Sequence, residues 1–233
     1  NGFRGPGAAV EKPAGVVRVV VAGASETFGL YESPGMEYAA QLDSVLERAE
    51  PGRFEVINAA SAGMTPPRIR FLWGAHLRRF DPDVLVFYPS PAFYLDARVP
   101  RDTVRVRTGP VPAPPPRPRL LRKISIVAKR VVPGALQAWV NELLARREAG
   151  GEEAEPWEAP PPDRVAAFER QVTELVDAVR RDSVRVVLAT HAVRFGGSMD
   201  AADRRHMAGW RKFYPLASAD CLLEMDEAAN EAI

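Results

Sequence analysis

The chain has 233 residues, of which 46% are hydrophobic and 26% are charged, and its formal net charge is +1. This length suits one large globular domain or two small ones, and we favour one. The nearly balanced charge gives no general attraction to nucleic acid, so we expect no nucleic-acid partner. The single cysteine, Cys221, excludes an internal disulfide and a cysteine-rich metal site in this sequence, and no apolar run approaches the roughly 20 residues of a membrane span.

The first strong pattern follows a glycine- and proline-rich segment, residues 1–15, which we interpret as an irregular lead-in. Residues 16–21 are β-branched apart from Arg18, which predicts a buried parallel strand. The run ends at Gly23, and Ser25 follows in the turn. Because open α/β sheets carry their chemistry at the carboxyl ends of strands, Ser25 is the first candidate functional residue.

Strand and helix patterns alternate along most of the remaining chain. Helical spacing from 36 to 49 precedes a strand at 54–58, a helix at 67–80 precedes a strand at 84–88, and a helix at 163–181 precedes a strand at 184–190. This order predicts parallel strands with helices on both faces of the sheet. We therefore expect a three-layer α/β/α sandwich in one domain over residues 16–233, with a mostly parallel sheet in the flavodoxin-like order 2-1-3-4.

Residues 100–162 interrupt this alternation and form a predicted insertion. Six prolines between 110 and 118 disfavour both helix and sheet. Residues 101–130 contain nine lysines and arginines and a single acidic residue, Asp102. An amphipathic pattern continues to residue 149. A basic amphipathic segment of this kind can contact an anionic membrane surface through 101–149 or cover a site as a lid, and it can equally pack its apolar stripe on the domain.

The residues from Gly23 to Gly29 must be distinguished from three loops that also follow a first strand. A phosphate-binding P-loop requires a Lys-Ser/Thr pair, and no lysine lies between Lys12 and Lys123. A dinucleotide loop requires glycine where Ser25 and Phe28 stand. A G-x-S-x-G nucleophile elbow requires glycine where Thr27 stands. All three loop types therefore fit poorly.

Three sequence blocks together resemble the SGNH (GDSL-type) hydrolase family. They are Gly23-Ala24-Ser25 with Thr27 and Gly29 after the first strand, the sequence NAASAG at 58–63 after the second, and DPDV at 81–84 before the third. The resemblance implies an SGNH-type α/β fold and serine-dependent hydrolysis, or transfer, of an ester acyl group, with no metal or organic cofactor. It assigns Ser25 as the nucleophile and the backbone N–H of Gly63 to the oxyanion hole.

Two blocks depart from the family pattern. Ala24 stands where the family commonly has aspartate, a position that is not the nucleophile. After the third strand the family has a glycine and an oxyanion-hole asparagine, whereas this chain continues with Tyr88, Pro89 and Ser90. We expect the hydroxyl of Ser90 to replace the missing amide as a hydrogen-bond donor.

The family's general base is the histidine of an Asp-x-x-His block after a fifth strand. Asp203 and His206 have this spacing and would be the catalytic pair if the chain is complete, but they directly follow the fourth predicted strand. We therefore expect the pair to lie beyond Ile233, in a longer protein of which this chain is a fragment. His191 is interpreted as a loop histidine and His76 as a structural one.

Two alternatives to catalysis stay open. One is a catalytically impaired SGNH-like domain that binds acylated glycan or lipid, and the other is a membrane-surface or partner-binding module acting through the basic insertion. The substrate implied by the resemblance is a small-molecule, glycan or lipid ester, and the implied location is exported or anchored in a bacterium. The sequence does not specify the oligomeric state.

Overall fold

The computed structural model describes residues 3–90, 157–192 and 217–233, with the single positions 136, 199, 200, 202, 203, 207 and 214. These residues belong to two compact units, the first within 1–99, 160–193 and 224–233 and the second within 100–159 and 194–223. The sheet lies in the first unit. The proline-rich and basic residues of the predicted insertion, and with them the predicted membrane contact, lie outside the described residues.

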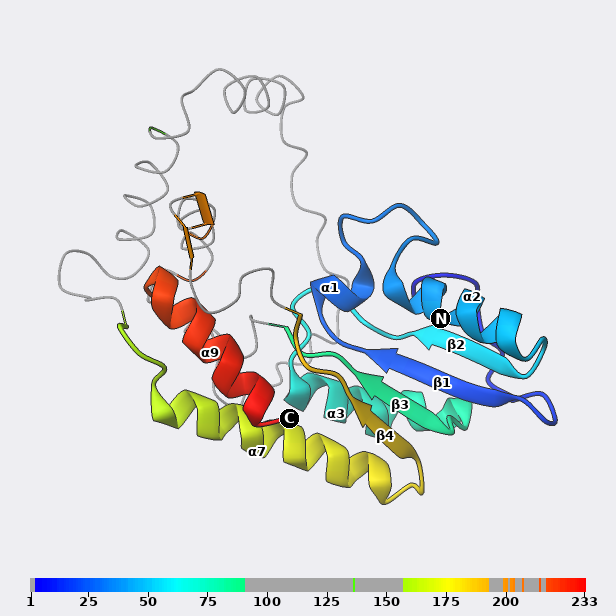
Figure 1. Cartoon of the computed structure of the whole chain (residues 1–233). Coiled ribbons are helices and arrows are strands. Elements are labelled where there is room, and N and C mark those ends of the chain that lie inside the picture. Colours follow the sequence, from blue (N-terminus) through cyan, green and yellow to red (C-terminus); the bar gives the residue numbers. More distant parts are fainter. Residues whose placement is uncertain are drawn as a thin grey trace, which may run out of the picture. The chain divides into compact units, whose positions relative to one another are not determined.

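Four parallel strands form the sheet (Figure 1). They are β1 (Val17–Ala22), β2 (Phe54–Asn58), β3 (Val84–Phe87) and β4 (Arg185–Leu188), in the order β2-β1-β3-β4. The predicted order is therefore confirmed. β1, one of the two inner strands, is the most buried of the four. Its Val20, Val21 and Ala22 have no exposed surface, as its continuous apolar run predicts.

Helices cover both faces of this sheet, and the predicted α/β/α arrangement is confirmed. Figure 1 shows α2 (Tyr38–Ala49) on one face and α3 (Pro66–Ala75) and α7 (Pro162–Arg180) on the other. Side chains alternate between the faces along a strand: Val19 and Val21 pack with Ala39 on the α2 face, so Val20 lies on the opposite face. The last described element is α9 (Ala219–Glu231).

Two predicted elements differ from the structure. The single helix expected over 67–80 is divided into α3 and a 3-10 helix, η1 (Leu77–Phe80), because His76 leaves the helical region at φ −137°. The turn expected around Ser25 is a one-turn helix, α1 (Ser25–Phe28). Gly29 ends α1 in the left-handed conformation at φ 70°, which glycine adopts without steric cost.

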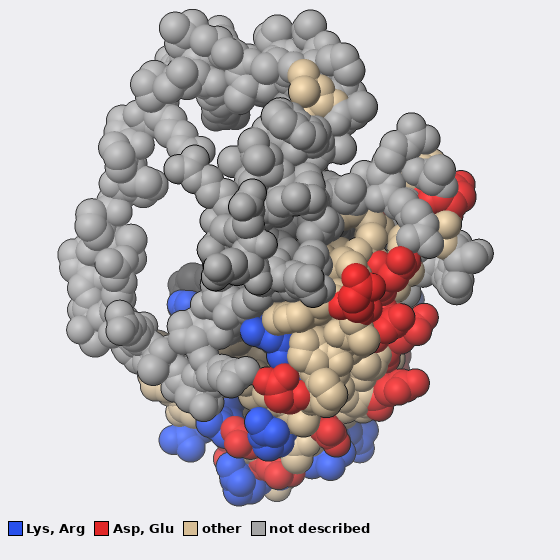
Figure 2. Space-filling model, turned by 90° about the vertical axis from the view of Figure 1, so that its left-hand side faces the viewer, with Lys and Arg blue, Asp and Glu red and all other residues tan. Residues whose placement is uncertain are grey.

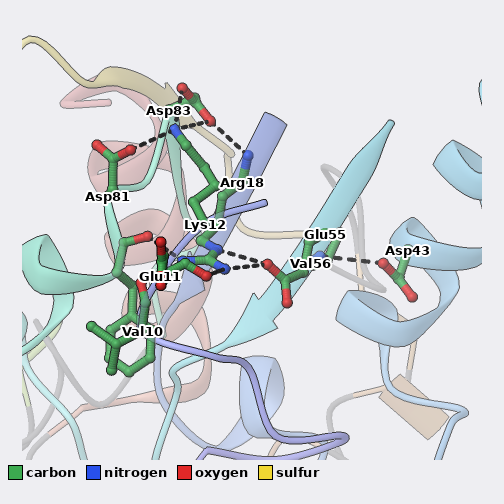
Figure 3. Close-up of polar contacts among 10 residues, drawn as sticks. Val10, Glu11, Lys12, Arg18, Asp43, Glu55, Val56, Asp81 and Asp83 are labelled. Atoms are coloured by element: carbon green, nitrogen blue, oxygen red, sulfur yellow. Dashed lines mark hydrogen bonds and ion pairs between the residues drawn. The ribbon is translucent and has the colours of Figure 1, made fainter. Parts of the chain in front are cut away.

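A charged residue inside the sheet anchors the lead-in (Figure 3). Arg18 in β1 is fully buried, and a buried guanidinium requires partners for its donors. Its Nε donates to Glu55 Oε2 at 2.7 Å, and its Nη1 donates to the carbonyl oxygens of Val10, at 3.1 Å, and Phe80. The Arg18 side chain of β1 thus binds the backbone of the lead-in at Val10. The composition of the lead-in did not predict this contact.

Asp83 completes the charge network at the amino end of β1 and β3. Its Oδ2 accepts the backbone N–H of Arg18 at 2.7 Å, and Lys12 Nζ lies 2.9 Å from its Oδ1. Partial burial opposes ionisation of the carboxyl, but these two donors outweigh it and hold the pKa of Asp83 below its usual value. Asp81 is bound by the same lysine at 3.0 Å but is 76% exposed.

Charges of both signs are present on the described surface. On the face drawn in Figure 2, acidic side chains lie along the right-hand side and basic side chains lie mainly at the lower end. Within the described ranges, no helix combines the length and the hydropathy that crossing a bilayer requires.

The lowered pKa of Asp83 predicts how stability depends on pH. A carboxyl whose pKa is lower in the folded state stabilises the fold above its unfolded pKa, about 3.9, and loses that contribution as pH falls through the folded pKa. Asp83→Asn should therefore unfold at lower urea concentration at pH 7 and lose less stability than the parent on acidification. Asp81→Asn is the control, with a smaller effect because its carboxylate is exposed. Identical pH dependence of the parent and Asp83→Asn would contradict the assignment.

Candidate active site

Ser25 lies where the sequence predicts it, directly after the carboxyl end of β1. It is the first residue of α1 and is partly exposed, whereas Thr27 in the same turn is fully buried. The Oγ of Ser25 donates to Glu26 Oε2 at 3.2 Å. The hydroxyl therefore lies at the surface of this edge and is not turned into the core.

Gly23 makes the sharp exit from β1 sterically feasible. A Cβ atom at this position would lie 1.9 Å from Thr27 Oγ1 and 2.8 Å from the carbonyl oxygen of Tyr88. Real Cβ atoms essentially never approach other atoms so closely. The exit from β1 can thus pack between α1 and the end of β3 only without a side chain.

The exit from β2 lies against the exit from β1. Ser61 N–H donates to the carbonyl of Gly23 at 3.4 Å, and the side-chain amide of Asn58 donates to the carbonyl of Thr27 at 3.0 Å. Gly63 is exposed in the left-handed conformation at φ 71°, and a Cβ atom there would meet nothing within 4 Å. The loops that carry Ser25 and Gly63 therefore lie side by side, and Gly63 borders open space.

The exit from β3 contributes Tyr88 and Ser90. Tyr88 N–H donates to the carbonyl of Ala22 at 3.1 Å, which holds this exit beside β1. Ser90 is 1% exposed, and its Oγ has no hydrogen-bond partner among the described residues. A buried hydroxyl without a partner costs about 1–3 kcal/mol, so Ser90 is a donor that a bound acceptor would satisfy.

The exit from β4 carries a histidine with a buried acidic partner. His191 Nδ1 lies 2.9 Å from Asp226 Oδ1 and 3.1 Å from Oδ2. Sequence reasoning treated His191 as a loop histidine and did not identify Asp226, because the two residues are 35 positions apart and no spacing motif links them. Only the docking of α9 brings them together.

Arg4 of the lead-in holds the loop that follows Ser25. Its guanidinium donates to the carbonyls of Gly29 at 2.7 Å and Glu32 at 2.9 Å, pairs with the buried Glu37 at 3.3 Å, and lies over the ring of Phe28 at 5.0 Å from the centroid. The sequence showed only an irregular segment here. The lead-in therefore helps to position the loop that follows Ser25 and α1.

The predicted Asp203–His206 pair falls on the second unit, so its prediction as the catalytic pair stays untested. Asp203 belongs to the second unit, where its backbone N–H donates to Asp200 Oδ1 at 2.8 Å, whereas Ser25 belongs to the first. His206 lies outside the described residues.

A hollow lies at the amino edge of the sheet, at the other end of the strands from Ser25. It is lined by Trp73, Arg78, Arg79, Asp81, Pro82, Asp182 and Val184, and Trp73 Nε1 donates to Asp182 Oδ2 there at 2.7 Å. Its lining includes no serine, histidine or cysteine. In the described part of the chain no group of three or more metal-ligating side chains occurs.

Comparison with known proteins gives structural similarities at low identity. No family profile matches the chain, and no curated protein matches it. Similar solved structures include TesA (14% identity, 92% of this chain and 97% of that chain covered, TM-score 0.35) and AlinE4, an SGNH-hydrolase family esterase (16% identity, 86% and 96%, TM-score 0.33). A catalytic mutant of Axe2, an acetylxylan esterase from Geobacillus stearothermophilus, is similar at 9% identity (92% and 93%, TM-score 0.32).

The steric constraint at Gly23 can be tested with a pair of glycine substitutions. Gly23→Ala should destabilise the protein by about 1–3 kcal/mol, the usual cost of overpacking, because the new methyl group would displace Thr27 or the backbone at Tyr88. Gly74→Ala, in α3 with open space around it, is the control and should be neutral or stabilising by about 0.5–1 kcal/mol. Urea unfolding measures both, and equal stabilities of the two variants would refute the constraint.

Proposed function

We propose that this chain is a serine-dependent ester hydrolase or acyl transferase in which Ser25 is the nucleophile. The main support is the juxtaposition of a partly exposed serine after β1 with the open backbone at Gly63, through the bond from Ser61 N–H to the carbonyl of Gly23. Attack by Ser25 on an ester would form a tetrahedral oxyanion, and its collapse would break the ester C–O bond, release the alcohol and leave an acyl-serine. Water or an acceptor alcohol would then cleave the acyl-serine and restore the hydroxyl of Ser25.

The proposed oxyanion hole consists of the backbone N–H of Gly63 and the hydroxyl of Ser90. Donors that are fixed before the reaction stabilise the negative charge as it develops, without reorganisation. The left-handed turn at Gly63 and the unpartnered buried Oγ of Ser90 support these roles. The proposed substrates are small-molecule, glycan or lipid esters, and the chemistry requires no cofactor.

A non-catalytic binding domain for acylated glycan or lipid is the second candidate. It is favoured by one observation: the hydroxyl of Ser25 donates to the carboxylate of Glu26, at 3.2 Å, and that bond does not activate it toward an ester in the way an imidazole would. The two candidates differ in whether the ester bond breaks, and substitution of Ser25 separates them.

The nucleophile assignment predicts burst kinetics. The protein should release p-nitrophenol from p-nitrophenyl acetate in a rapid burst of about one equivalent, followed by slower turnover, because acylation precedes deacylation. Ser25→Ala should abolish both phases. Ser33→Ala, an exposed serine farther along the same loop, should leave them unchanged. Binding of acetylated ligand without any Ser25-dependent release would instead favour the binding domain.

The role of Ser90 predicts opposite effects on stability and activity. Ser90→Ala removes a buried hydroxyl that has no partner among the described residues, so the free energy of unfolding should be unchanged or higher. The loss of an oxyanion donor should lower kcat/KM by roughly 10²- to 10³-fold. Esterase kinetics and urea unfolding measure the two quantities. Unchanged kcat/KM would exclude Ser90 from the oxyanion hole.

A further inference from the structure

The carboxyl edge of the sheet contains an acid–imidazole pair that the proposed function does not yet use. The side chains of His191 and Asp226 are only 9% and 5% exposed, and both carboxylate oxygens lie within 3.1 Å of Nδ1. An ionised carboxylate only accepts hydrogen bonds, so this contact assigns the imidazole hydrogen to Nδ1. In the neutral imidazole, Nε2 then carries a lone pair and can accept a proton.

The pair is held by one face of α9. Asn230, one helical turn after Asp226, accepts the backbone N–H of His191 at 2.7 Å and donates to the carbonyl of His191 at 3.0 Å. Backbone and side chain of the histidine are thus fixed by the same helix. The neighbouring acids on α9 (Glu224, Glu227 and Glu231) are exposed, whereas Asp226 is 3% exposed. Burial of a carboxylate is costly without a partner, and His191 is one partner of Asp226.

The strand register puts the exits of β1 and β4, which lead to Ser25 and His191, at the same edge of the sheet. Ala22, Phe87 and Leu188 are adjacent across β1, β3 and β4. Three residues after each of these positions the chain carries, in the same order, Ser25, Ser90 and His191. β1 and β4 are separated only by β3, which at a strand spacing of about 4.8 Å puts their backbones roughly 10 Å apart. A histidine side chain and a serine side chain together can span most of that distance.

Tyr88, at the exit of the intervening β3, contacts both sides. Its ring centroid lies 5.6 Å from that of His191, and its Oη accepts the N–H of Ala192 at 3.1 Å. Its ring also lies 5.7 Å from that of Tyr38, whose hydroxyl is bonded to Thr27 of α1 at 3.5 Å. Burial raises the pKa of Tyr88, and the charges of Glu26 and Asp226 add to this effect. The phenol is therefore within electrostatic reach of the residue next to Ser25 and of the partner of His191.

We propose that His191 is the general base for Ser25 and that Asp226 is its positioning residue, an inference that rests on the proposed function. Ser25 Oγ forms a bond to the ester carbonyl carbon while its proton moves to His191 Nε2. The π electrons of the C=O bond move onto the carbonyl oxygen, which becomes the oxyanion. When the oxyanion collapses, the C–O bond to the alcohol breaks and Nε2 returns the proton to the leaving oxygen. Water repeats the sequence on the acyl-serine and regenerates the hydroxyl of Ser25.

This assignment differs from the sequence-based expectation, which put the base at His206 or beyond Ile233. It uses a histidine from the exit of β4 and an aspartate from α9, two elements that share no motif. The groups that face the imidazole in the described structure are Asp226 of α9 and the phenol of Tyr88.

The test measures p-nitrophenyl acetate hydrolysis by the full protein chain and its variants. His191→Gln should lower kcat/KM by roughly 10²- to 10⁴-fold, the usual contribution of a general base. Asp226→Asn should lower kcat with little change in KM and should remove the low-field Nδ1 proton signal of His191 in NMR spectra. Glu227→Gln, the exposed neighbour on α9, should change neither. Added imidazole should restore part of the activity of His191→Ala.

The outcomes separate this inference from the proposed function. Ser25-dependent hydrolysis that persists in a folded His191→Gln variant overturns the assignment of the base and leaves the nucleophile in place, whereas a parent protein without Ser25-dependent hydrolysis overturns both. If substitution of His191 prevents folding, the unsubstituted protein decides the question. A phosphonate attached to Ser25 should shift the NMR signal of His191 Nε2, and an unshifted signal overturns the inference.

Discussion

The absence of space for a side chain at Gly23 is the constraint on which the carboxyl edge depends. A Cβ atom at Gly23 would overlap Thr27 and approach the carbonyl of Tyr88, so β1, α1 and the exit of β3 meet at one glycine. The carbonyl of the same glycine accepts the N–H of Ser61 from the exit of β2. One position thus determines how closely the loops of three strands approach, and with them the distance between Ser25 and its proposed oxyanion donors.

The two ends of the sheet differ in how fully their polar groups are satisfied. At the amino end the donors of the buried Arg18 and the carboxylate of Asp83 are bound by several partners, which stabilises the strands and the lead-in. At the carboxyl end the Oγ of Ser90 has no partner in the described structure and Gly63 borders open space. Locally unfavourable groups are typical of functional sites, because a ligand can supply the missing interactions. This contrast supports the proposal that chemistry takes place at the carboxyl end.

Long-range contacts position the proposed catalytic groups from both ends of the described chain. Arg4 binds the loop after α1 through the carbonyls of Gly29 and Glu32, and Asn230 binds the backbone of His191 on both sides. Rigid support of this kind matters for acyl transfer because small displacements of reacting groups slow it strongly. The lead-in and α9 are therefore parts of the site and not only of the scaffold.

The sequence alone determined the parallel sheet, its order and the place of Ser25, because these follow from local patterns: β-branched runs, helical spacing and short glycine-containing exits. It did not predict the end of α3 at His76, because no residue there signals the change in backbone conformation. The sequence blocks also put Gly63 beside Ser25, but the bonds from Ser61 and Asn58 became visible only in the folded chain. The partners of Arg4, Arg18 and His191 were decided by tertiary structure alone. Each of these contacts joins residues far apart in sequence, and such pairings depend on how helices and loops dock, which no periodicity or motif within one segment encodes.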